Sequence, residues 1–296
     1  MACLHPQTAY WSKVVNPSGK RSLVFQLADA LSPIKVEIKC GQCINCRIQH
    51  AAQSAVRCVH EAKSHDVSSF VTLTYSNKNL PVDGGLHHYD FQLFLKRLRA
   101  RSDFKFKMVM CGEYGEVTNR PHYHALLFGC DFSDRKFYKK TPIGHTLDTS
   151  VLLEDCWQLG LCTVGDVTYE SCRYVTGYIT KKITGPKADD HYMGRRPDYI
   201  VWGNGIGKAH FDKYGAAYYD NDFVIVDGKR MKIPRYYDTK FELVDSERLA
   251  DVKKVRVRKA LSRKRSDPDK DTPRRSWTVE QVGLSAIARK DRDYET

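Results

Sequence analysis

The chain is short of acidic residues relative to basic ones, and it lacks long apolar runs. Its 296 residues include 48 Lys and Arg against 35 Asp and Glu, a formal net charge of +13. This excess predicts attraction to a polyanion, most simply a nucleic acid. No segment is long enough to span a bilayer, and the first residues lack the basic and apolar regions of a signal peptide. We therefore expect no membrane partner and no secretion signal.

Signatures of nucleotide binding and of disulfides are also missing. The Gly-rich stretch at residues 202–208 lacks the spacing and the following helix of a P-loop. Ten cysteines without a secretion signal indicate reduced thiols or metal ligands rather than disulfides. We also find no internal repeat.

Three cysteines stand in a C-x2-C-x2-C pattern, Cys40, Cys43 and Cys46. Three thiolates at this spacing can converge on Zn²⁺, with Cys3 or His5 as the fourth ligand. The alternative is a turn that caps the next helix. The pattern thus indicates a candidate structural zinc site and leaves that alternative open.

Hydrophobic periodicity predicts a mixture of helices and strands. Helices are expected at 47–65, 89–100, 151–160 and 170–182, the last capped by Thr168 or Ser171. Strands are expected at 23–27, 34–38, 68–75, 106–111, 120–129 and 162–169, with an Asp-Gly hairpin at 223–234. Residues 131–150 are polar and are expected to form a loop. The basic tail from 253 is expected to be partly helical or disordered.

One strand carries two histidines two residues apart. On a strand, His122 and His124 would share a face, because residues i and i+2 point the same way. Glu113, at the end of the strand expected to pair with it, could add a carboxylate, and Glu116 is the alternative. Two imidazoles and one carboxylate suit Mg²⁺ or Mn²⁺ acting on a phosphodiester. The competing interpretation is a pair of surface histidines.

The last of these helices carries Tyr174 and Tyr178, which lie four residues apart on one face. A phenol has an ordinary pKa of about 10, so it needs a nearby cation or base to act as a nucleophile. Lys181, one turn from Tyr178, could supply that charge. The alternative is that the tyrosines only pack on the sheet.

Basic clusters are candidates for contacts with a nucleic-acid backbone. We expect these at the flank of the 89–100 helix, at Lys182 and along the tail. The helix flank is formed by Lys96, Arg97, Arg99 and Arg101. The alternative is a solvated charged face.

The order of these motifs resembles the HUH endonuclease superfamily. The matching segments are residues 70–75, His122-Tyr123-His124 and the helix from Tyr174 to Lys182. With the cysteine cluster and residues 112–115, the chain resembles the replication initiation proteins of gokushovirus-type microviruses, which are small single-stranded DNA phages. The resemblance covers about residues 35–210. Family members often carry a basic residue before the second tyrosine, where this chain has Gly177. That departure favours Tyr178 with Lys181 as the better-equipped pair.

The resemblance implies an α+β, HUH-endonuclease-like fold with a central antiparallel sheet flanked by helices. It also implies a metal-dependent nickase and strand-joining enzyme that forms a 5′-phosphotyrosine during rolling-circle replication. We expect N-terminal strands and the Cys-rich element at 1–46, the catalytic domain at 47–215, a hairpin extension at 216–252 and the basic tail at 253–296.

The implied partners are single-stranded or locally melted origin DNA and the host helicase and polymerase. The implied location is the cytoplasm of a bacterial host, and the sequence does not indicate an oligomeric state. Two other hypotheses remain: a non-catalytic zinc-containing DNA-binding protein, and a phosphodiesterase that uses water as the nucleophile.

Overall fold

A computed structural model gives the structure of the chain. It describes residues 3–295 except 103–104, 116–117, 143, 182, 184, 186 and 267–271, and at 179–181, 187, 263–266 and 286–295 it describes the backbone only. The chain divides into two compact units. The first comprises Met1–Gln49 with Lys264–Ile287, and the second His50–Arg263 with Ala288–Thr296.

The second unit is built on an antiparallel sheet. Within the described residues it has seven strands in the order β10-β5-β6-β4-β9-β8-β7. The strands are β4 (Ser68–Thr74), β5 (Lys107–Tyr114), β6 (Pro121–Phe128), β7 (Lys136–Lys140), β8 (Thr146–Thr149), β9 (Cys162–Asp166) and β10 (Tyr199–Trp202). The histidine strand, β6, is an interior strand between β5 and β4.

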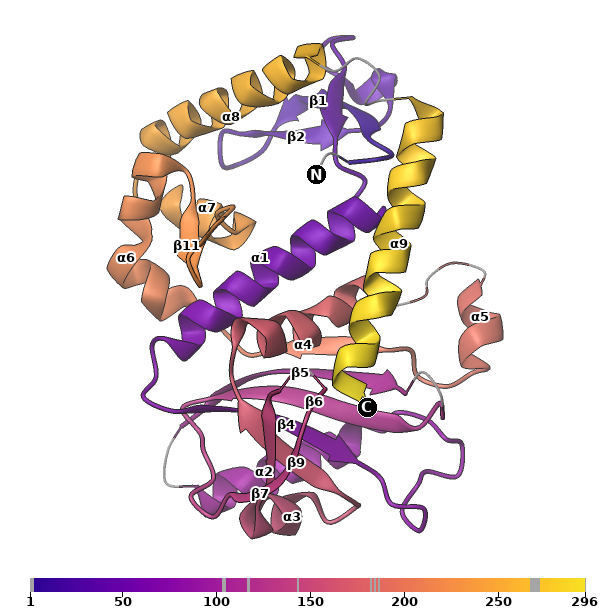
Figure 1. Cartoon of the computed structure of the whole chain (residues 1–296). Coiled ribbons are helices and arrows are strands. Elements are labelled where there is room, and N and C mark those ends of the chain that lie inside the picture. Colours follow the sequence, from indigo (N-terminus) through magenta and orange to yellow (C-terminus); the bar gives the residue numbers. More distant parts are fainter. Residues whose placement is uncertain are drawn as a thin grey trace. The chain divides into compact units, whose positions relative to one another are not determined.

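Helices cover both faces of this sheet (Figure 1). α1 (Ile44–Ala62) and α4 (Tyr169–Lys181) pack on the face that carries Leu126 and Phe128. α2 (His88–Arg101) and α3 (Val151–Trp157) pack on the opposite face, with Tyr123 and Leu127. Alternate residues of β6 thus enter two different cores, as the two-residue period of a strand requires. The predicted α+β fold with a central antiparallel sheet is confirmed.

The helix phases follow the sequence patterns. The apolar stripe of α2 is buried, and its residues are Phe91, Phe94, Leu95 and Leu98. α4 begins after Thr168, whose Oγ1 accepts from Ser171 N at 3.1 Å, while Ser171 Oγ accepts from Thr168 N at 2.8 Å. This reciprocal cap satisfies two donors at the helix start and explains why α4 begins there.

The prediction of a loop at residues 131–150 is wrong. This segment contains the antiparallel pair β7 and β8, which forms the edge of the sheet. All five residues of β7 are exposed. A fully exposed edge strand shows no alternation of apolar and polar residues, so periodicity could not reveal it.

The rest of the second unit is mostly helical. It contains α5 (Lys187–Tyr192), α6 (Lys208–Asn221), α7 (Arg235–Phe241) and most of α8 (Ser246–Ser266). The predicted Asp-Gly hairpin is confirmed as β11 (Val224–Val226) and β12 (Lys229–Met231). Its turn residues have φ of 48° at Asp227 and 72° at Gly228, as a type I′ turn requires.

The first unit holds a small sheet, a 3-10 helix and part of the tail. Its described strands are β1 (Gln7–Val15), β2 (Arg21–Val24) and β3 (Val36–Ile38), in the order β2-β1-β3, and η1 spans Leu27–Asp29. β2 and β3 overlap the two predicted strands, whereas β1 was not predicted. Most of the tail is helical, in α8 and in α9 (Pro273–Glu295). Among the described residues, no helix combines the length and apolar character that a bilayer crossing requires.

Candidate active site

Strand pairing brings the two histidines and the carboxylate together. In the β5–β6 pair, Glu113 lies opposite His122 and Cys111 lies opposite His124. Residues two apart on paired strands share a face, so the three side chains point to the side of the sheet covered by α4. Each offers a donor atom within 4.8 Å of the others. The sequence-predicted cluster therefore exists as a geometric unit.

The distances within this triad are short. Glu113 Oε1 lies 2.8 Å from His122 Nε2 and 2.7 Å from His124 Nε2. The Nδ1 atoms are held by other groups: His122 Nδ1 donates to the carbonyl oxygen of Arg120 at 3.0 Å, and His124 Nδ1 lies 2.9 Å from Thr72 Oγ1. Such bonds fix the ring orientation and direct both Nε2 atoms to the same point.

The environment of Glu113 favours its charged form. Burial opposes ionisation, but the charge of His122 and hydrogen bonds from His122 and His124 outweigh it and lower the pKa of Glu113 to about 2. A buried carboxylate with two imidazoles is a donor set for a divalent cation. Bonds of about 2.1 Å at right angles would place neighbouring ligand atoms about 3.0 Å apart, close to the distances observed here. The residues present thus fit an octahedral ion such as Mg²⁺ or Mn²⁺.

Tyr174 joins this triad directly. Its hydroxyl donates to Glu113 Oε1 at 3.2 Å and lies 3.3 Å from His124 Nε2. Its ring meets that of His124 edge to face, with centroids 4.9 Å apart. The first two turns of α4 therefore deliver a phenolic oxygen to the candidate metal site.

Tyr178 lies one turn further along α4, with only 3% of its surface exposed. Its ring contacts that of Tyr174 at a centroid distance of 5.3 Å and lies nearly parallel to that of His124 at 6.3 Å. Burial, the charge of Glu113 and the proximity of Tyr174 raise the pKa of Tyr178 well above its ordinary value. The two tyrosines are therefore placed differently relative to the triad.

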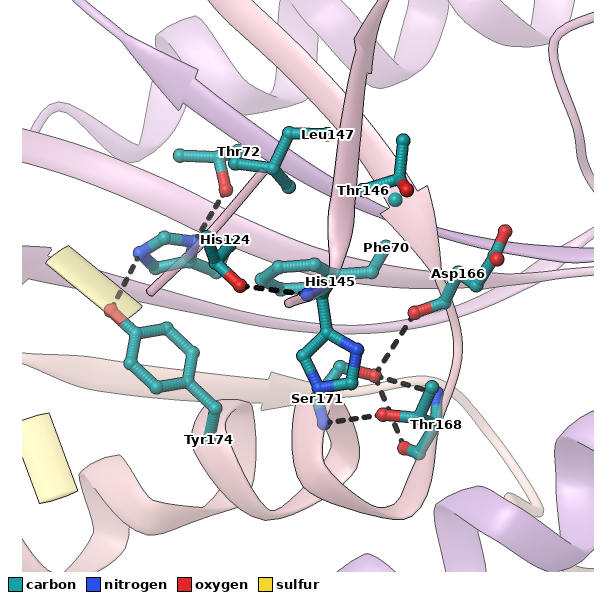
Figure 2. A pocket seen from close by; sticks show the side chains of 12 residues that line it. Phe70, Thr72, His124, His145, Thr146, Leu147, Asp166, Thr168, Ser171 and Tyr174 are labelled. Carbon is teal, nitrogen blue, oxygen red and sulfur yellow. Dashed lines mark hydrogen bonds between the residues drawn. The ribbon is translucent and has the colours of Figure 1, made fainter. Parts of the chain in front are cut away.

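A cavity of about 70 Å³ opens beside Tyr174 and His124. Figure 2 shows these two side chains next to each other, with Asp166 and Thr168 at the other end of the cavity. His145, from the β7–β8 hairpin, and Phe70 of β4 also line it. The cavity gives the triad and Tyr174 a shared approach, and Tyr178 does not line it.

The predicted DNA-binding arginines lie on the other face of the sheet. α2 packs against the core that contains Tyr123, not the one that contains Tyr174. Arg97 donates to the carbonyl oxygen of Cys156 at 3.2 Å, and Arg99 stacks over the ring of Phe106 at 5.5 Å. Arg101 also reaches α3, through Cys156 Sγ at 3.8 Å. Their side chains are therefore remote from the triad.

Some predicted residues fall outside the described part of the site. The side chain of Lys181 and the whole of Lys182 lie outside the described residues, as does Glu116. Their predicted roles stay predictions.

The predicted cysteine cluster is assembled in the first unit. Cys3, Cys40, Cys43 and Cys46 offer sulfur atoms within 4.8 Å of one another. Cys3, rather than His5, completes the group, and His5 Nε2 instead lies 3.4 Å from Glu280 Oε2.

Sequence reasoning missed two contributors to the site. Thr72 was seen only as part of a strand, although its hydroxyl holds His124. His145 was assigned to a loop. The register of β4 on β6, which sets Thr72 opposite His124, could have been inferred only once the two strands were known to be neighbours.

The fold and the histidine-carboxylate cluster define the class: an α+β domain of the HUH-endonuclease-like type, with its metal donors on an interior strand and tyrosines on the helix above. Residues 68–183 match the family model for the phage replication-associated protein ORF2. That segment contains the triad and both tyrosines.

Three phage proteins are similar to the chain. The replication-associated protein VP4 of Bdellovibrio phage phiMH2K is 33% identical over 210 residues, which cover 66% of this chain and 64% of that protein. The replication-associated protein ORF2 of Spiroplasma virus 4 is 31% identical over 211 residues, 67% and 65% of the two chains. The replication-associated protein ORF4 of Chlamydia phage 1 is 28% identical over 209 residues, 67% and 52%.

The chain belongs to this family of phage replication-associated proteins. The predicted resemblance to microvirus-type replication initiators is thereby confirmed. The matched region spans less than two thirds of the length of each of these relatives. No solved structure matches the chain.

Proposed function

We propose that this protein starts and ends rolling-circle replication of a circular phage DNA as a metal-dependent, site-specific nickase and strand-joining enzyme. The observation that carries the proposal is the position of the Tyr174 hydroxyl, 3.2 Å from Glu113 Oε1 and 3.3 Å from His124 Nε2. The names of the similar phage proteins support a role in replication.

The metal site would be formed by Glu113, His122 and His124. A divalent ion bound there would polarise the scissile phosphate as a Lewis acid and neutralise the charge that develops on it. Thr72 and the Arg120 carbonyl would keep the two imidazoles in the orientation that binding requires.

In the cleavage step, the Tyr174 oxygen attacks phosphorus and the bond from phosphorus to the 3′ oxygen breaks. The products are a 5′-phosphotyrosine and a 3′-hydroxyl. The hydrogen bond that Tyr174 donates to Glu113 gives the phenolic proton a path away from the attacking oxygen, and the departing 3′ oxygen takes up a proton. The phosphotyrosyl bond keeps the energy of the phosphodiester, so rejoining needs no ATP.

The contacts of Tyr174 favour it over Tyr178 for the first cleavage, the reverse of the order expected from the spacing of Lys181. Tyr174 also lines the cavity, whereas Tyr178 is buried behind it. Tyr178 would then act in the second transfer, when a 3′-hydroxyl released at the regenerated origin attacks the phosphotyrosine and closes the circle.

The substrate would be single-stranded or locally melted origin DNA, with the host helicase and polymerase extending the 3′ end in the host cytoplasm. The arginines of α2 would contact DNA away from the scissile phosphate, since they lie on the other face of the sheet. That contact and the one predicted for Lys182 stay predictions.

The test is formation of a protein–DNA adduct that survives denaturation. With origin single-stranded DNA and Mn²⁺, we expect adduct from the unaltered chain and roughly a 100-fold or greater loss of its rate with Tyr174→Phe. Tyr178→Phe should keep the first adduct and lose rejoining. Tyr169→Phe, a change at the first residue of the same helix, is the matched control and should do neither.

Two results would contradict the proposal. Cleavage of the DNA without any adduct would identify water as the nucleophile. Binding of the DNA without cleavage by folded protein supplied with Mn²⁺ would favour a non-catalytic DNA-binding protein.

Removal of the metal is a separate test. EDTA should abolish adduct formation, and added Mn²⁺ or Mg²⁺ should restore it, because the polarising charge on the phosphate would be lost and regained. Adduct formation that continues unchanged in EDTA would rule out a catalytic role for the ion.

A further inference from the structure

A second cluster of metal-binding side chains lies in the first unit. Cys3 Sγ is 3.5 Å from Cys40 Sγ and 3.9 Å from Cys43 Sγ, and Cys46 belongs to the same group. Four thiolates bound tetrahedrally to zinc at about 2.3 Å would stand about 3.8 Å apart. Sulfur atoms in a disulfide are only about 2.05 Å apart. The spacing therefore matches a shared ion rather than bonded pairs.

Backbone amides point at these sulfur atoms. Cys40 N donates to Cys3 Sγ at 3.3 Å, Cys43 N to Cys40 Sγ at 3.2 Å and Leu4 N to Cys43 Sγ at 3.4 Å. Amide hydrogen bonds stabilise the negative thiolate, which is the form that binds metal. Gly41, at φ +75°, makes the turn that presents the Cys40 and Cys43 amides.

We propose that Cys3, Cys40, Cys43 and Cys46 bind one Zn²⁺ as a structural site. Four protein thiolates complete a tetrahedral shell and leave no position for water or substrate, which distinguishes a structural zinc from a catalytic one. The site is separate in chemistry from the histidine-carboxylate triad, which uses oxygen and nitrogen donors and suits a harder ion.

The small core of the first unit explains why an ion is needed there. Among its described residues, the buried hydrophobic side chains are Ala9, Cys43, Ile44 and Cys46. Two of these four are the proposed ligands. Larger apolar side chains of the unit are exposed, among them Trp11, Phe25 and Ile34. So little buried surface cannot hold a fold by itself, and a metal is one of the usual substitutes.

The proposed ion would also position a docking point for α9. Ile44 follows the ligand Cys43, and Gly283 of α9 packs against it so closely that a Cβ at Gly283 would lie 3.2 Å from Ile44 Cγ1 and Cγ2. Zinc would therefore join the segment before β1, the start of α1 and the C-terminal helix within one unit.

Metal content tests this inference. Protein purified under reducing conditions without chelators should contain about one zinc per chain by elemental mass spectrometry. Cys46→Ser and Cys3→Ser should lower that content by roughly 10-fold or more. Cys130→Ala, which removes a buried thiol of the second unit, is the matched control and should leave it unchanged.

Cobalt substitution protects the test against variants that fail to fold. The unaltered chain refolded with Co²⁺ should show the charge-transfer and visible bands of a tetrahedral thiolate site. Absence of these bands, zinc content that Cys46→Ser does not change, or iron in place of zinc would each overturn the proposal. None of these readouts depends on DNA cleavage, so the zinc site and the proposed nickase can fail independently.

Discussion

Thr72 positions a candidate metal ligand without belonging to the triad. Its hydroxyl lies 2.9 Å from His124 Nδ1, opposite the nitrogen that faces Glu113. Thr72→Val keeps the shape of the side chain and removes the hydrogen bond. We expect the Mn²⁺ concentration for half-maximal adduct formation to rise about 10- to 100-fold, as for other partners of metal-bound histidines. A Mn²⁺ titration of adduct yield measures this.

The matched control is Thr163→Val, at the position opposite Thr72 on β9. It makes the same chemical change on the same face of the sheet and should leave the Mn²⁺ requirement unaltered. Equal shifts for the two variants would show that the effect comes from general loosening of the sheet rather than from His124.

The sequence predicted most of the site's side chains but not how they meet. The i, i+2 spacing of His122 and His124 and the place of Glu113 at a strand end were enough to predict a shared face. The contact of Tyr174 with that face could not be predicted, because the rotation of α4 about its axis depends on how the helix packs on the sheet. The spacing of Lys181 instead favoured Tyr178.

The end of α1 carries a histidine whose burial makes stability depend on pH. His60 is 2% exposed, with Nδ1 3.0 Å from Tyr237 Oη and its ring stacked on His210 at 4.1 Å. Burial, with the positive charges of His210 and Lys63, lowers the pKa of His60 to about 3. The unfolded chain, with a pKa of 6.5 there, binds a proton first as pH falls.

Stability from a neutral His60 is therefore present above about pH 6.5 and is lost as pH falls toward about 3. Between about pH 7 and pH 5 we expect this group alone to lower the free energy of unfolding by about 2 kcal/mol. Urea unfolding at both pH values measures it. His60→Gln should reduce the difference by that amount, and an unchanged pH dependence would contradict the buried neutral state.

Gly177 lies within α4 between the two tyrosines. A Cβ at this position would meet no atom within 4 Å, and its φ is not in the left-handed region. Gly177→Ala should therefore raise the free energy of unfolding by about 0.5–1 kcal/mol, because alanine loses less backbone entropy in a helix. Thermal unfolding tests this, with Gly160→Ala as the contrasting variant. There the new Cβ would lie 2.4 Å from Ser76 N, and we expect destabilisation.

Helices and interior strands could be predicted because their burial leaves a periodic pattern. α2 and β6 each have apolar residues at the spacing that their cores demand. β7 and β1 leave no such pattern, since β7 is fully exposed and β1 buries only Ala9 and Ser12. The β7–β8 hairpin still matters for the site, because His145 at its turn lines the cavity beside Tyr174.

The net charge of +13 should make binding to single-stranded DNA strongly dependent on salt. α8 exposes a run of basic side chains that includes Arg258 and Lys259. If both contact phosphates, Arg258→Gln with Lys259→Gln should reduce the slope of log K against log salt by about 1.4. Fluorescence anisotropy between about 50 and 300 mM salt measures this slope.

The same substitution at Arg97 and Arg99 on α2 gives the comparison. A change in slope there and none for α8 would move the DNA path to the other face of the sheet. No change for either pair would exclude both surfaces as contacts with the DNA backbone.

The pairing of Glu113 with His122 has a consequence for folding quality. If β5 slipped by one residue against β6, alternation would turn Glu113 to the face that carries Tyr123, and the ion would lose its carboxylate. Affinity for Mn²⁺ therefore reports the registration of two strands at the centre of the sheet. A preparation that contains misregistered molecules would titrate with fewer sites than chains, so a metal titration doubles as an assay of correct assembly.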